Sequence, residues 1–260
     1  MIEINNISRC FGANKVLDGL SLVIKTGETK VIIGRSGCGK SVLLKHIVGL
    51  LKPEKGGVSI DGLEVTHLND KELNLFRLRL KIAMLFQGGA LFDSLTVGEN
   101  VGFVLSEYTD TAKSTIVKKV REALSMVGLK DIEHLMPSDL SGGMKKRVAL
   151  ARAICMQPKI LLYDEPTTGV DPITADAIND LIIELHDKLE VTSVVVTHDM
   201  VSAYKVADRI AMLYRGKIIQ MGTPDEIKNT SNPFVKQFIT GASTGAITDA
   251  ENLVFGHVQD

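Results

Sequence analysis

The chain of 260 residues is 45% hydrophobic and carries a formal net charge of −1 at pH 7. Its length fits one large α/β domain or a core with an inserted subdomain, and its near-neutral charge argues against nucleic acid or an acidic membrane surface as a partner. The three cysteines are scattered without C-x-x-C spacing, which argues against a disulfide framework or a zinc site and favours a reducing compartment. The first residues lack the features of a signal peptide, and no run approaches the ~18 consecutive apolar residues of a spanning helix, so we expect a soluble, intracellular protein.

Short apolar runs broken by turn residues open the chain. Residues 1–33 alternate apolar and polar positions, which predicts antiparallel strands followed by a buried strand at 31–33. Residues 58–62 and 82–86 have the composition of two further strands. From about residue 95 to residue 155 the apolar positions recur every three or four residues, which is typical of amphipathic helices.

Strands resume after this helical block. Apolar runs at 160–163 and 193–196 are separated by a helix-like segment at 174–189. The predicted fold class is therefore α/β, with a mainly parallel sheet, an N-terminal antiparallel β subdomain and a helical subdomain inserted between strands of the core.

A glycine-rich loop follows the strand 31–33 and leads into a helix-like segment. It fits the phosphate-binding pattern G-x-x-x-x-G-K-[ST]. Glycines let backbone N–H groups converge on phosphate oxygens, and the helix N-terminus adds positive potential. Lys40 is expected to reach the β- and γ-phosphates and the Ser41 hydroxyl to contact Mg²⁺. The nucleotide-binding residues predicted here are Gly34, Arg35, Ser36, Gly37, Cys38, Gly39, Lys40, Ser41 and Val42.

Polar residues at the ends of three other strands are expected to face this loop, because ligands collect at the carboxyl edge of an open α/β sheet. Asp164 suits Mg²⁺, directly or through a water, and Glu165 suits the acceptance of a proton from the attacking water. His198 is expected to contact the γ-phosphate or that water, and Gln87 offers an amide oxygen to Mg²⁺ or water. Each of these residues, taken alone, is also typical of an ordinary strand end, and the P-loop is what favours the catalytic interpretation.

A second anion-binding device lies at Ser141, Gly142 and Gly143. These residues precede a helix-like run, where a hydroxyl and unobstructed N–H groups favour an anion. An ordinary helix cap before a basic, solvated face is the alternative. The chain thus has two predicted phosphate-binding segments but only one P-loop. A head-to-tail dimer explains both, because each nucleotide would lie between one copy's P-loop and the other copy's Ser-Gly-Gly.

Taken together, these residues resemble the ATP-binding subunit of ABC transporters across nearly the whole chain. The matching segments, in the family's order, are the Walker A loop 34–41, the Q-loop at Gln87, the signature LSGGM at 140–144, Walker B at 160–165, the D-loop at 169–171 and the switch histidine His198.

The resemblance implies an ATP-hydrolysing motor that binds ATP and Mg²⁺ between two copies of the chain. Closure on ATP and opening on hydrolysis would drive a transmembrane permease. The resemblance also implies that Glu165 is the general base, that Asp171 signals across the dimer interface and that Phe11 stacks on the adenine. Such a subunit is peripheral on the cytoplasmic face of the inner membrane.

Two departures from the commonest family pattern indicate a branch. Met144 follows the second glycine of the signature where many relatives have Gln, and residues 88–101 read GGALFDSLTVGENV where many importers carry a Pro-containing segment. Both features are similar to the branch that serves MCE-type lipid transport, the Mla (maintenance of lipid asymmetry) systems. The resemblance therefore implies a phospholipid cargo, moved between bacterial membranes with a permease and an MCE-domain protein.

Other functions remain open at this stage. An importer for a polar solute would keep the motor and change the cargo. A soluble ABC ATPase of translation or DNA maintenance usually has two cassettes or a long coiled-coil insertion, which this sequence lacks. A regulatory module that holds ATP without cleaving it is disfavoured because Lys40, Asp164, Glu165 and His198 are all in place.

We assign residues 1–228 to the ATPase domain, with the helical subdomain inserted at about 90–156, and residues 229–260 to a C-terminal tail. Apolar side chains recur in this tail among polar ones. A frayed end is one interpretation; docking on the second copy, which would strengthen the dimer, is the other. The apolar residues concerned are Phe234, Phe238, Ile247, Leu253, Val254 and Phe255.

Overall fold

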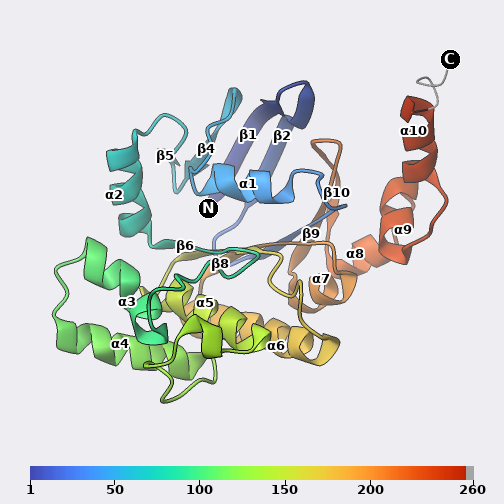
Figure 1. Ribbon diagram of the computed structural model, residues 1–260. Helices are drawn as coiled ribbons and strands as arrows, with labels where there is room; N and C mark the ends of the chain where they lie inside the picture. Colours follow the sequence, from blue (N-terminus) through green and yellow to red (C-terminus); the bar gives the residue numbers. More distant parts are fainter. Residues whose placement is uncertain (256–260) are drawn as a thin grey trace.

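Two β-sheets and their helices are stacked in layers in this computed structural model, which describes the backbone of residues 1–255 and the side chains of residues 1–250 other than Arg79 (Figure 1). The smaller sheet is antiparallel, with strand order β2-β1-β4-β5. Its strands are β1 (Ile2–Phe11), β2 (Asn14–Ile24), β4 (Lys55–Ile60) and β5 (Leu63–Glu64).

The larger sheet has the order β10-β9-β3-β8-β7-β6 and is parallel except for β10, which pairs with β9 in the antiparallel sense. Its strands are β3 (Thr29–Ile33), β6 (Ile82–Leu85), β7 (Ile160–Asp164), β8 (Thr192–Thr197), β9 (Arg209–Tyr214) and β10 (Lys217–Gly222).

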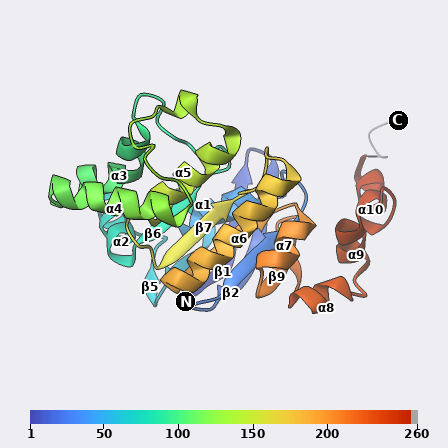
Figure 2. The ribbon, with the colours of Figure 1, turned by 90° about the horizontal axis from the view of Figure 1, so that it is seen from below.

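Helices cover both faces of the larger sheet. Helix α1 lies between the two sheets, whereas α5, α6 and α7 lie on the opposite face (Figures 1 and 2). The helices are α1 (Lys40–Ile47), α2 (Asp70–Leu80), α3 (Val97–Tyr108), α4 (Lys113–Met126), α5 (Gly142–Ile154), α6 (Pro172–Leu189), α7 (Met200–Val206), α8 (Pro224–Lys228), α9 (Pro233–Thr240) and α10 (Ala246–Phe255), with a short 3₁₀ turn at Pro137–Asp139.

Alternate residues of the central strands pack into two different cores. Ile32 of β3 and Leu162 of β7 belong to the core around α1 and the antiparallel sheet. Val31 and Leu161 belong to the core formed with the helices on the other face. A parallel sheet covered on both faces requires such continuous apolar runs, which is why these strands are visible in the sequence.

The register brings three central strands to an end at one edge of the sheet. Ile33 pairs with Thr197, and Asp164 pairs with Val196. The loop after β3, the residue after β7 and the residue after β8 therefore leave the sheet side by side. This alignment assembles the site described below.

The fold class predicted from the sequence is confirmed, including the antiparallel sheet and the helical block between β6 and β7. Gly128 adopts a φ of 73°, in the left-handed region, just after α4. Among the described residues, none of the helices combines the length and apolar character that crossing a bilayer requires.

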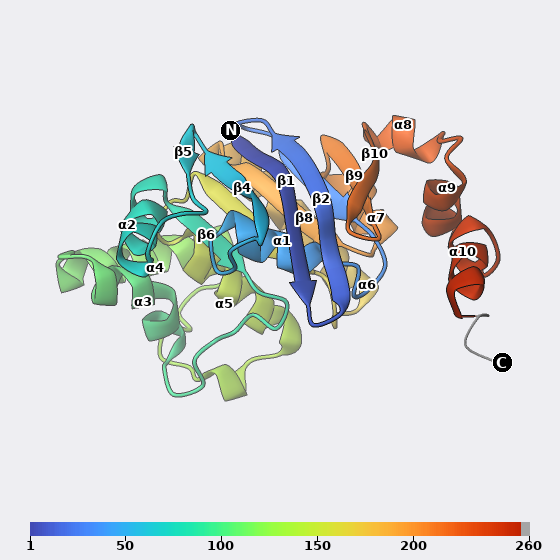
Figure 3. The ribbon, with the colours of Figure 1, turned by 90° about the horizontal axis from the view of Figure 1, so that it is seen from above.

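Helices α8 to α10 extend from β10 at one side of the molecule (Figure 3). The ring of Phe234 on α9 lies 5.1 Å from the ring of Tyr214, and the Arg215 guanidinium donates to the carbonyl of Ala250 at 2.9 Å. Part of the tail therefore packs on its own chain instead of fraying. Residues 256–260 of the predicted tail lie outside the described residues, as do the side chains of Leu253, Val254 and Phe255.

Candidate active site

The P-loop between β3 and α1 folds around its own lysine. Gly39 has a φ of 106°, and a Cβ there would lie 2.9 Å from Val16 Cγ1 on β2, so glycine lets the loop enter α1 at this point. Lys40 is 5% exposed, and its ammonium donates to the carbonyls of Gly34 at 2.8 Å and Arg35 at 3.2 Å. The cation is thus fixed at the place where the motif requires phosphate oxygens.

Glu165 connects this lysine to the histidine at the end of β8. Its Oε1 lies 3.2 Å from Lys40 Nζ, and its Oε2 lies 2.8 Å from His198 Nδ1. Thr168, which the sequence analysis did not select, donates to the same Oε2 at 3.2 Å. Glu165 is 6% exposed and His198 is half exposed, so the carboxylate is held inside while the imidazole reaches solvent. This arrangement suits a proton acceptor beside bound phosphate.

Ser41 and Asp164 form the third part of the arrangement. The Ser41 hydroxyl donates to Asp164 Oδ1 at 2.7 Å. Burial raises the pKa of Asp164, and the Ser41 hydrogen bond opposes that shift. Gln87 lines the pocket that Ser41 also lines. A hydroxyl, a carboxylate and an amide oxygen are donors that fit Mg²⁺, which takes few protein oxygens together with substrate phosphates.

Six of the nine residues predicted in the P-loop segment 34–42 line one open pocket of about 270 Å³. Gly34 and Arg35 contribute the carbonyls that hold Lys40, and the Cys38 thiol packs against Gly34, where a Cβ would lie 2.7 Å from its sulfur. The residues that line the pocket are Val16, Ser36, Gly37, Gly39, Lys40, Ser41, Val42, Gln87, Glu165 and His198.

Phe11 lies at the end of β1 and is absent from the lining of this pocket. Its ring is 44% exposed, and the Arg9 guanidinium lies 5.0 Å from the ring centroid. Val16, which the sequence analysis did not select, does line the pocket. Adenine stacking by Phe11 stays a prediction.

The predicted signature residues 141–143 and Asp171 do not line the pocket; they lie at helix N-termini on the surface. The Ser141 hydroxyl caps α5 by accepting from the N–H of Met144 at 3.3 Å. Asp171 caps α6, accepting from the hydroxyl of Thr174 at 2.6 Å and from its N–H at 3.0 Å, and these hydrogen bonds lower the pKa of Asp171. Within the described residues of one chain, the structure does not bring the P-loop and the predicted second phosphate-binding segment 141–143 together.

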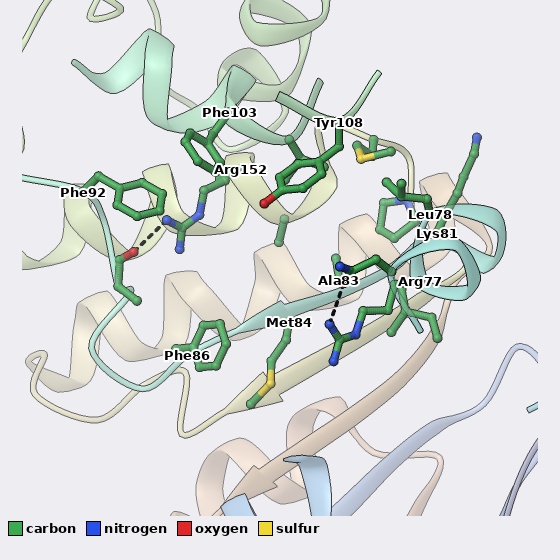
Figure 4. Close-up of a pocket in the computed structure, with 17 residues that line it drawn as sticks. Arg77, Leu78, Lys81, Ala83, Met84, Phe86, Phe92, Phe103, Tyr108 and Arg152 are labelled. Atoms are coloured by element: carbon green, nitrogen blue, oxygen red, sulfur yellow. Dashed lines mark hydrogen bonds between the residues drawn. The ribbon is translucent and has the colours of Figure 1, made fainter. Parts of the chain in front are cut away.

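A second, more apolar cavity of about 490 Å³ lies among α2, β6, α3 and α5 (Figure 4). Phe92, Phe103 and Tyr108 line one side, and Arg77 of α2 lies on the opposite side. Arg152 of α5 projects into the cavity, with its guanidinium 5.9 Å from the centroid of the Phe92 ring. The cavity therefore combines an aromatic wall with cations.

Part of the segment 88–101 serves the fold. Thr96 and Glu99 form a capping box at the start of α3. The buried amide of Asn100 donates to the carbonyls of Phe92 (3.0 Å), Leu95 (2.9 Å) and Thr96 (3.0 Å) and accepts from the N–H of Phe92 at 2.8 Å. These residues shape the turn that presents Phe92 to the second cavity.

The model of the ABC transporter family matches residues 17–168. The chain belongs to this family. A solved dimeric ATP-binding cassette in a post-hydrolysis state, bound to ADP and Pi, superposes with a TM-score of 0.78 and 35% identity, over 86% of this chain and 99% of that one. This family member is accordingly an α/β ATPase that binds ATP and serves as a subunit of a transporter.

Two relatives point to different cargoes. The intermembrane phospholipid transport ATP-binding protein MlaF of Haemophilus influenzae is 39% identical over 95% of this chain and 93% of its own length. The methionine import ATP-binding protein MetN of Carboxydothermus hydrogenoformans is 44% identical over 92% of this chain and 71% of its own length. The family and the ATPase activity are therefore shown, whereas the cargo is not decided by identity alone.

Proposed function

We propose that this chain is the motor subunit of a complex that moves phospholipid between bacterial membranes. The observation that carries the proposal is the similarity to MlaF along nearly the full length of both chains. The segment 88–101 supports it, because its Ala90 and Phe92 line the aromatic cavity where a membrane partner would bind.

ATP hydrolysis is assigned to the P-loop pocket. Lys40 neutralises the charge of the β- and γ-phosphates, and Glu165 accepts the proton of the attacking water. His198 holds the Glu165 carboxylate from the solvent side and reaches the γ-phosphate. Lys40 Nζ lies 3.2 Å from the Glu165 carboxylate. Bound phosphate would draw the ammonium toward itself and leave the carboxylate to the water.

Mg²⁺ is assigned to Ser41, Gln87 and Asp164. The hydrogen bond between Ser41 and Asp164 already holds two of these oxygen donors together. When bound, the cation supplies further neutralisation of phosphate charge.

The complete ATP site is assigned to two copies of the chain. Residues 141–143 at the exposed N-terminus of α5 would bind the nucleotide held in the partner copy's P-loop. Asp171 is the N-cap of α6, at the same exposed end of the helix as Ile173, which is 83% exposed. The dimeric state of the solved cassette supports this assignment.

The membrane partner is assigned to the second cavity. Phe92, Phe103 and Tyr108 offer apolar surface, and Arg77 and Arg152 offer charge at its sides, which suits a short amphipathic helix of a permease. The chain would then sit on the cytoplasmic face of the inner membrane, with an MCE-domain protein as a further member of the complex.

An importer for a polar solute is the second candidate. The observation in its favour is the 44% identity to a methionine import ATP-binding protein. It keeps every assignment in the ATP site and changes only the permease and the cargo.

Co-purification distinguishes the two candidates. The tagged full chain is isolated from membranes in mild detergent, and associated proteins and lipids are identified by mass spectrometry. Recovery with a permease, an MCE-domain protein and bound phospholipid is the expected result. Recovery with a solute permease and no MCE-domain protein would establish the importer instead.

A further inference from the structure

The segment after β6 is held to α5 by cationic side chains. The Lys146 ammonium donates to the carbonyl of Gln87. The Arg152 guanidinium, further along the same helix, donates to the carbonyls of Gly89 at 2.6 Å and Ala90 at 2.7 Å. Three carbonyls of this short loop are therefore bound by one helix, which fixes the path of the loop.

Lys146 is an unusual member of this set because it is only 9% exposed. Burial lowers its pKa, and the charges of Asp164 and Glu165 act in the opposite direction. A buried cation is costly unless its partners compensate, so a role as a solvated surface lysine does not apply.

The contact joins two functional elements of the same chain. Gln87 lines the P-loop pocket, and Ser141 caps the N-terminus of the helix that carries Lys146. The backbone bond at Gln87 sets where its side chain leaves the loop. Displacement of this backbone would move the Gln87 amide away from the pocket and separate it from the signature helix.

We propose that Lys146 is a positioning residue for Gln87 in ATP hydrolysis, an inference that rests on the proposed role of Gln87 in the ATP site. Its ammonium holds the Gln87 backbone against α5, so that the Gln87 amide and the Ser-Gly-Gly end of this helix move as one unit. Lys146 itself contacts no phosphate in this scheme. It acts only through Gln87.

The test replaces Lys146 in the full-length chain by Met, which keeps the aliphatic length, and by Arg, which keeps a cation. For Lys146→Met we expect kcat for ATP hydrolysis to fall about tenfold, while the affinity for a fluorescent ATP analogue changes less than about twofold. The Mg²⁺ concentration for half-maximal activity should rise. Lys146→Arg should recover most of the lost kcat.

Arg147→Met is the matched control. Arg147 is the next residue of α5 and also donates to a carbonyl, that of Val127 at 2.9 Å, but away from the loop after β6. This variant should lower the melting temperature without the selective loss of kcat. An equal loss of kcat in Arg147→Met, at equal stability, would overturn the proposal.

A double variant tests whether Lys146 acts through Gln87. In a Gln87→Ala background, Lys146→Met should reduce kcat by less than about twofold, because the group to be positioned is already gone. A further tenfold loss in that background would contradict the proposal, as would full kcat in the single variant. If Lys146→Met does not fold, Lys146→Ala, which also removes the donor to the Gln87 carbonyl, provides the same comparison.

Discussion

At the residue scale, Glu165 is the group whose neighbours define the chemistry of the pocket. It contacts Lys40, His198 and Thr168, and it adopts a left-handed φ of 49°. That conformation costs a non-glycine residue on the order of 1 kcal/mol, so the surroundings hold the carboxylate in place against local strain.

Glu165→Gln is therefore expected to stop hydrolysis without preventing ATP binding. Removal of the general base should lower kcat by about 100-fold or more, and ATP should then accumulate in a closed dimer. Steady-state ATPase assays and size-exclusion chromatography with ATP measure the two effects. Glu184→Gln, at an exposed position on α6, serves as the control. Parental turnover in Glu165→Gln would remove this residue from the role of base.

Asp164 is the residue at which function and stability oppose each other. Burial raises its pKa, so the ionised carboxylate is less favourable in the folded chain than in the unfolded chain. For an acid with a raised pKa, this penalty is absent at low pH and grows as the pH rises through its titration.

Asp164→Asn should consequently raise the melting temperature at neutral pH by about 1–3 °C, because the neutral amide lacks this penalty and can still accept from Ser41. The same variant should lose ATPase activity. Differential scanning calorimetry and an ATPase assay test both parts. A lower melting temperature would show that the ionised carboxylate stabilises the folded chain.

At the scale of single elements, α5 carries three structural features along its length. Its N-terminus holds the Ser-Gly-Gly residues, Lys146 binds the loop after β6, and Arg152 reaches the aromatic cavity. The position of the Ser-Gly-Gly residues depends on where the helix begins, and Ser141 fixes that point by capping the helix.

Substitutions at Ser141 separate capping from nucleotide binding. Ser141→Asp keeps a good cap but places a negative charge where phosphate is expected, so turnover should be lost with little change in stability. Ser141→Ala removes the cap and should cost about 1 kcal/mol, or about 2–4 °C in melting temperature. Thermal melts and ATPase assays distinguish these effects. Full turnover in Ser141→Asp would exclude contact of this residue with phosphate.

The elements that the sequence predicts are those with a strong local signal. The central strands are continuous apolar runs, and the P-loop is a fixed pattern, so β3, β7, β8 and the loop after β3 could be located directly. Helix α2 and strands β9 and β10 were not assigned. Lys146 was also missed, because a lysine beside other basic residues indicates a solvated helix face. Its burial arises only when the loop after β6 packs on α5.

At the scale of the whole molecule, the C-terminal helices α9 and α10 extend away from the ATPase core (Figure 3). Phe234 packs on Tyr214, and the buried Gln237 side chain donates to Ala242 O (3.1 Å) and accepts from Ile247 N (2.7 Å), so α9 and α10 are organised by their own chain. We propose that this C-terminal arm, which comprises α9 and α10, also docks on the second copy. Its apolar residues would then stabilise the dimer.

Truncation after residue 232 tests the arm. The shortened chain should need a higher concentration to form the ATP-bound dimer, as measured by analytical ultracentrifugation with the Glu165→Gln substitution present in both chains. Pull-down of the permease from membranes provides a second readout. Unchanged self-association and unchanged complex assembly would show that the arm serves only its own chain.

The central claim is that each ATP site is built from two copies of the chain, and mixing two inactive variants tests it most directly. Lys40→Ala lacks a working P-loop and Ser141→Asp lacks a working signature. A mixed dimer contains one site with both defects and one site with neither. A 1:1 mixture should therefore recover up to about a quarter of the parental ATPase rate, given random pairing and independent sites.

The control is the double variant Lys40→Ala, Ser141→Asp mixed with the parental chain, where both sites of a mixed dimer carry one defect and the rate should fall. Recovery in the first mixture and inhibition in the second are the results that a shared site predicts. A first mixture as inactive as its separate components, together with a second mixture that keeps the full activity of its parental chains, would show that one copy holds the complete site.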